Sequence, residues 1–166
     1  MSSTFKQVGS LVFNQQQGTI KHARTDEDLA KYIVKIAIPV HLLAKSVSVA
    51  IDSAGEKEVT GHFELKSELL KHLSEAYLEA NAGTPSATDA VVEVQLYNWT
   101  DGASVVSLSF SGEGGFKKSS NIADTLKTLS GKVLCGRLYV STASATGGAA
   151  QIFMSIVLVL IYDLTK

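Results

Sequence analysis

The chain has 166 residues, of which 45% are hydrophobic and 19% are charged. This composition supplies enough apolar side chains for one buried core and excludes an intrinsically disordered chain. Fifteen basic and sixteen acidic side chains leave a net charge of -1, which excludes a strong overall field toward nucleic acid or membranes. A single cysteine, Cys135, excludes an intramolecular disulfide and a zinc site built from several cysteines.

Residues 1–24 are polar and contain no acidic side chain. We predict an N-terminal arm or a loosely held first strand there, followed by a single sandwich domain over residues 25–166. The segment is either an ordinary polar terminus or an arm that contacts a neighbouring subunit through Leu11 and Phe13. Its start lacks the apolar run of a signal peptide, so we expect synthesis in a host cytoplasm. Its basic residues are candidate nucleic-acid contacts of weak, salt-sensitive strength: Lys6, Lys21 and Arg24.

Alternation of apolar and polar residues dominates the next part of the chain. Residues 31–39, 46–51 and 58–65 each alternate with period two, which indicates strands with one wet face. The alternation in the first of these segments ends at Pro39, and we predict that the strand ends there.

The segment Ser67–Asn81 has the pattern of an amphipathic helix. Ser67 is a suitable N-cap, and Asn81 is followed by Ala82, Gly83 and a proline, which favour a helix end. The apolar stripe of the predicted helix is formed by Leu69, Leu70, Leu73 and Tyr77.

A hairpin is predicted around Asp101-Gly102, a pair that favours a type I′ turn. The strands on either side of this turn cover residues 92–97 and 103–110. A glycine loop, a short helix over Asn121–Leu129 and two final strands over residues 132–141 and 149–164 complete the predicted elements.

The last strand is apolar on both faces over Ile152–Tyr162, a run about half as long as a membrane-spanning helix needs. One face of such a strand belongs to the core, and the second face also needs a cover. Either the predicted helix Ser67–Asn81 or a neighbouring copy covers it. The candidate subunit contacts on the second face are Phe153, Val157, Val159 and Ile161.

Catalytic and cofactor motifs do not emerge. In the glycine loop Gly112–Gly115, a phenylalanine precedes Lys117, which breaks the phosphate-binding pattern. The four histidines form no metal-ligand or catalytic spacing. We therefore expect no enzyme activity, no cofactor and no metal, and we interpret Cys135 as a small buried residue.

Trp99 stands at the mouth of the predicted hairpin with Tyr97 beside it. These aromatic residues either pack over one end of a sandwich or contact a ligand such as a sugar. The second interpretation supports an alternative function as a carbohydrate-binding module or a virion decoration protein.

Regular strands with helices only in two connections predict an antiparallel jelly-roll or Greek-key β-sandwich. The whole chain resembles a single jelly-roll viral capsid protein in its arm Met1–Arg24, its hairpin at Asp101-Gly102 and its doubly apolar strand Ile152–Tyr162. The resemblance implies a shell-building subunit that assembles with copies of itself and with related capsid subunits. It also implies a location in the virion and no catalysis.

Overall fold

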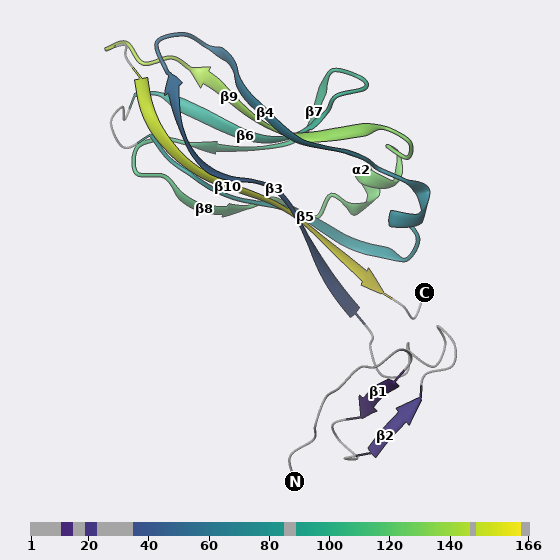
Figure 1. Cartoon of the computed structure of the whole chain (residues 1–166). Helices are drawn as coiled ribbons and strands as arrows, with labels where there is room; N and C mark the ends of the chain where they lie inside the picture. The colour runs from purple at the N-terminus through teal and green to yellow at the C-terminus, as the bar shows by residue number, and fades with distance from the viewer. Residues whose placement is uncertain (1–10, 15–18, 23–34, 85–88, 147–148, 164–166) are drawn as a thin grey trace.

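The computed structural model describes the chain except for residues 1–10, 15–18, 23–34, 85–88, 147–148 and 164–166 (Figure 1). Two four-stranded antiparallel sheets face each other and enclose the core. In sheet order, the first contains β3 (Lys35–Ala50), β10 (Ala149–Asp163), β5 (Leu73–Ala82) and β8 (Gly115–Lys118). The second contains β4 (Gly55–Glu64), β9 (Val133–Thr142), β6 (Val91–Asn98) and β7 (Ala103–Phe110).

The pairing of the eight sandwich strands is nested. The first pairs with the last, β3 with β10, and the inner pairs are β4 with β9, β5 with β8 and β6 with β7. The contacts of β10 with β5 and of β9 with β6 then complete the two sheets. A long folded-back hairpin rolled up in this way is a jelly roll, so the predicted fold class is confirmed.

The core lies between the sheets and is built from the inward positions of every long strand. Met154, Ile156 and Leu158 on β10 are completely buried, and so is Cys135 on β9, as predicted. Two short helices close one end of the core, a 3-10 turn η1 (Ser67–Leu69) and α2 (Ala123–Lys127). The second helix confirms the prediction over 121–129 with narrower bounds.

The predicted helix Ser67–Asn81 is wrong. Only its first turn is helical, and β5 takes up the rest of it. From Ala76 to Ala82 every second residue is buried, which is the period of a strand. The helical spacing of Leu69, Leu70, Leu73 and Tyr77 misled the sequence interpretation. Long-range pairing with β10 and β8 overrides this local preference.

Three further predictions need correction. β3 does not end at Pro39 but runs on to Ala50 and has 16 residues in all; proline is tolerated because β3 is an edge strand. The glycine loop leads directly into β8, which the sequence interpretation missed. The turn at Asp101-Gly102 joins a hairpin as predicted, but Trp99–Gly102 form a longer loop in which Gly102 alone has positive φ, so it is no type I′ turn.

In the N-terminal part of the chain, β1 (Leu11–Asn14) and β2 (Thr19–His22) pair with each other in a two-stranded sheet. Figure 1 draws them beyond the ends of β3 and β10. Residues 1–10 and 23–34 lie outside the described part of the chain. The division into an arm over 1–24 and a domain over 25–166 therefore stays a prediction.

Candidate subunit interface

The outer face of β10 is the most distinctive surface of the molecule. Leu158 and Leu160 point into the core and are 0% and 2% exposed. Their neighbours Val157, Val159 and Ile161 point the other way and are only partly buried. β10 is thus apolar on both faces, as predicted, and of the two covers expected for the outer face the helix Ser67–Asn81 is not formed. The segment expected to cover it is β5, which lies beside β10 in the same sheet.

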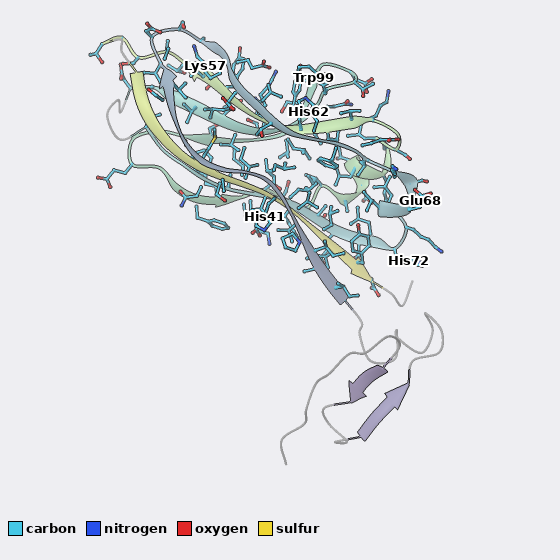
Figure 2. All side chains as sticks on the ribbon, viewed as in Figure 1. His41, Lys57, His62, Glu68, His72 and Trp99 are labelled. Atoms are coloured by element: carbon cyan, nitrogen blue, oxygen red, sulfur yellow. The ribbon has the colours of Figure 1, made fainter. Side chains whose placement is uncertain are left out.

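Neighbouring strands extend this apolar surface. Across the sheet, Val159 stands between Pro39 of β3 and Tyr77 of β5, and the next row places Val157 beside the exposed His41. We call Pro39, Tyr77, Val157, Val159 and Ile161 the β10 outer strip. Among the residues that the structure describes, no helix or strand lies over this strip; Figure 2 shows His41 on the same open side.

Paired charges border the β10 outer strip. Lys35 Nζ lies 2.6 Å from Glu75 Oε1, and the Tyr77 hydroxyl donates to Glu75 Oε2 at 2.8 Å. Lys118 Nζ lies 3.4 Å from Glu79 and 3.8 Å from the centre of the Tyr77 ring. Two lysines thus balance two glutamates in these pairs.

The same contacts shift the pKa values in this border. The hydrogen bond from Lys35, followed by that from Tyr77, lowers the pKa of Glu75 below its ordinary 4.5. Glu75 in turn raises the pKa of Lys35 and that of the Tyr77 hydroxyl. At neutral pH the two partners of the pair are therefore charged. An apolar centre with a polar border is the usual anatomy of a protein–protein contact.

On the opposite sheet, the outer face is polar and aromatic. The guanidinium of Arg137 lies 3.6 Å from the centre of the Tyr97 ring and 5.2 Å from that of Tyr139. Arg137 Nε donates to Gln95 Oε1 at 2.8 Å, and the Gln95 amide donates to Glu93 at 2.7 Å. The polar groups of this ladder thus satisfy one another. Arg137 came from no sequence motif; Tyr139 lies two residues further along the same strand, but only the register of β9 with β6 brings Tyr97 to Arg137.

Trp99 and Tyr97 come together as the sequence suggested. Trp99 is 50% exposed and packs edge-on against His62 of β4 with ring centres 5.0 Å apart, and against Tyr97 at 6.5 Å. Figure 2 shows Trp99 and His62 side by side at this sheet. The hairpin loop beneath is held by Asp101, which accepts from Asn98 at 2.7 Å and from Lys132 at 2.8 Å. His62 was not predicted in this cluster.

The glycine loop has a structural role. Gly114 has a φ of 70°, and a β-carbon there would collide with the Ala82 carbonyl oxygen. A β-carbon on Gly83 would lie 2.5 Å from the Glu113 carbonyl oxygen. The glycines let the loop backbone pack directly against the end of β5, which accounts for them without a bound phosphate.

The remaining predicted site residues lie wholly or with their side chains outside the part of the chain that the structure describes. The backbones of Leu11, Phe13 and Lys21 lie in β1 and β2, and that of Phe153 lies in β10, but their side chains are outside the described part. Two further basic residues of the arm, Lys6 and Arg24, are wholly outside it. Within the described residues, no three His, Cys, Asp or Glu side chains gather as metal ligands, and no helix is long and apolar enough to span a membrane.

Comparisons with known proteins give a distant likeness only. No protein-family model matches the chain, and no curated protein matches it. Among solved structures, it is similar to a structure of infectious bursal disease virus, Gx strain, at 12% identity and a TM-score of 0.47 over 78% of this chain and 32% of that one. The VP2 subviral particle of that virus matches with 12% identity and a TM-score of 0.48 over 80% and 34%.

A third similar structure is a disulfide-linked pilus of Bacillus endospore appendages, with 11% identity and a TM-score of 0.28 over 78% of this chain and 84% of that one. The chain spans about a third of the length of the two viral chains. All three TM-scores lie below 0.5, so none of these likenesses bears on the function of this chain.

Proposed function

We propose that this chain is a structural subunit that assembles with copies of itself through the β10 outer strip, and that the assembly is a viral shell. The observation that carries the proposal is the open apolar face of β10, a central strand whose other face is fully buried. The jelly roll itself supports a shell only by analogy, since the same fold also serves lectins and cupins.

The energetics favour association of two such faces. Fully burying a valine or isoleucine side chain is worth about 1.5–3 kcal/mol. The residues of the strip are already partly buried, so covering each of them on association would gain a fraction of that free energy. Several residues covered together supply a few kcal/mol in total, on the order of what a weak contact repeated around a shell needs. The balanced lysine and glutamate pairs at the border keep two identical faces from repelling each other.

The finer parts of the shell hypothesis follow from it. The subunit has no catalytic role and resides in the virion, together with related capsid subunits where the shell contains several kinds. The arm contacts neighbouring subunits through Leu11 and Phe13. Lys6, Lys21 and Arg24 add a weak, salt-dependent attraction to nucleic acid.

The test is to place a charge at the centre of the strip. Val159→Lys puts an ammonium group on the outer face of β10, where the folded monomer can leave it in water. Ser109→Lys is the matched control, because it adds the same charge to an exposed position on the edge strand of the opposite sheet. Sedimentation velocity should show assembly for the wild type and for Ser109→Lys, and monomer for Val159→Lys. Equal assembly by both variants would contradict the proposal, provided that circular dichroism shows both folded.

A second candidate function rests on Trp99. A large aromatic ring that is 50% exposed beside His62 and Tyr97 offers a stacking surface for a sugar ring. This observation favours a carbohydrate-binding module or a decoration protein. Binding to a glycan array that disappears in Trp99→Ala would support it, and an array without signal for the wild type would dismiss it.

A further inference from the structure

One titratable side chain lies inside the apolar face that carries the proposed contact. His41 on β3 is the register partner of Val157, so its side chain points to the same side of the sheet as the β10 outer strip. It is exposed, and Figure 2 shows it on this open side of the molecule. A second copy that covers the strip therefore covers the imidazole of His41 as well.

The charged groups of this face are engaged elsewhere. Across the sheet, the row of His41 continues with Glu79 on β5 and Lys118 on β8, which pair with each other at 3.4 Å. Lys35 pairs with Glu75 further along the sheet. The side chain of His41 forms no hydrogen bond or ion pair with another described residue. The two neighbouring rows on this face are uncharged: Pro39, Val159 and Tyr77 on one side, and Ala44, Ser155 and Asn81 on the other.

The opposite sheet offers His41 no charged partner either. Two of its strands approach the residue after His41, Leu42, with Gly61 of β4 and Gly136 of β9. The ionisable residues next to these glycines are His62 and Arg137. Both lie on the outer face of their own sheet, where His62 packs against an aromatic ring and Arg137 stacks between two. Figure 2 shows His62 well apart from His41.

The charge of His41 therefore decides how well this face can be covered. A histidine side chain changes its charge between about pH 5 and 8. The neutral imidazole fits an apolar contact, whereas an imidazolium without a partner loses its water without compensation. Between two identical faces this penalty applies twice, because each copy contributes one His41.

We propose that His41 makes the association through the β10 outer strip pH-dependent, and that its protonation separates the copies. The association is present where His41 is neutral and is lost as the pH falls and His41 becomes charged. This inference rests on the proposed function and names the regulation of that same contact.

Sedimentation velocity of the full-length chain at about pH 7.5 and about pH 5.5 tests it. For the wild type we expect association to weaken at least about tenfold at the lower pH. His41→Gln is neutral at both pH values and should associate at both, whereas His41→Arg is charged at both and should stay monomeric. His62→Gln is the matched control, since it removes an exposed histidine from the opposite sheet and should behave like the wild type. Circular dichroism at both pH values shows that each protein is folded.

The outcomes separate this inference from the proposed function. If the wild type associates equally at both pH values, the inference about His41 is wrong and the β10 outer strip stands. If His41→Gln loses its association at low pH as the wild type does, another group is responsible and the inference is also wrong. If the wild type is monomeric at both pH values, the proposed function fails and this inference fails with it.

Discussion

Truncation to alanine at two adjacent residues of β10 should have different effects: one variant should lose mainly stability, and the other mainly association. Leu158 is completely buried in the core, and Val159 faces outward in the β10 outer strip. Leu158→Ala removes a fully packed side chain and leaves a cavity, which costs about 2–5 kcal/mol of unfolding free energy. Val159→Ala removes less and from a partly exposed site, so its cost to the monomer is about 1 kcal/mol or below.

The order should reverse for association. Val159→Ala removes part of the contact surface and should weaken assembly, whereas folded Leu158→Ala keeps that surface intact. Urea unfolding at low protein concentration measures the first effect, and sedimentation of the folded proteins measures the second. If the two variants lose equal stability, β10 does not have one core face and one outer face. If Leu158→Ala alone weakens assembly, the contact lies elsewhere.

Other expected outcomes are more local. Gly114→Ala should cost at least about 2 kcal/mol in urea unfolding, because a β-carbon collides with the backbone of β5; Gly131→Ala has a similar φ but open space and should cost about 1 kcal/mol. In an NMR titration, Lys35→Met should raise the pKa of Glu75 toward 4.5. In the wild type the pKa of Glu75 is lowered, so its carboxylate stabilises the fold above about pH 4.5. This contribution is lost as the pH falls through the lowered pKa of Glu75. Burial raises the pKa of the Cys135 thiol, so native protein should react with a thiol reagent only after unfolding.

Much of the fold followed from local patterns. The strand over 103–110 has the predicted bounds, and β10 differs from its prediction at the final residue only, which lies outside the described part. These segments were predictable because their alternation or their continuous apolar run is independent of distant partners. The segment 67–81 was not, since its residues favour a helix and become a strand only when β10 and β8 pair with them.

The candidate interface was predictable in part for the same reason. The two apolar faces of β10 are visible in the sequence, and Val157, Val159 and Ile161 lie on its outer face as expected. Of the two covers expected for the second face, the one by the helix Ser67–Asn81 is wrong because most of that segment is β5, and the cover by a neighbouring copy stays a prediction. Pro39 and Tyr77 join the strip only through strand register, which the sequence does not specify locally.

The central claim is that this protein assembles with itself, and sedimentation velocity of the wild-type chain over a range of concentrations measures it most directly. The account predicts a sedimentation coefficient that rises with concentration, with dimers or larger species at tens of micromolar protein. Because the strip is apolar and the lysines and glutamates beside it are paired, moderate salt should leave the association in place. A single monomeric species at every concentration and salt condition would contradict the account.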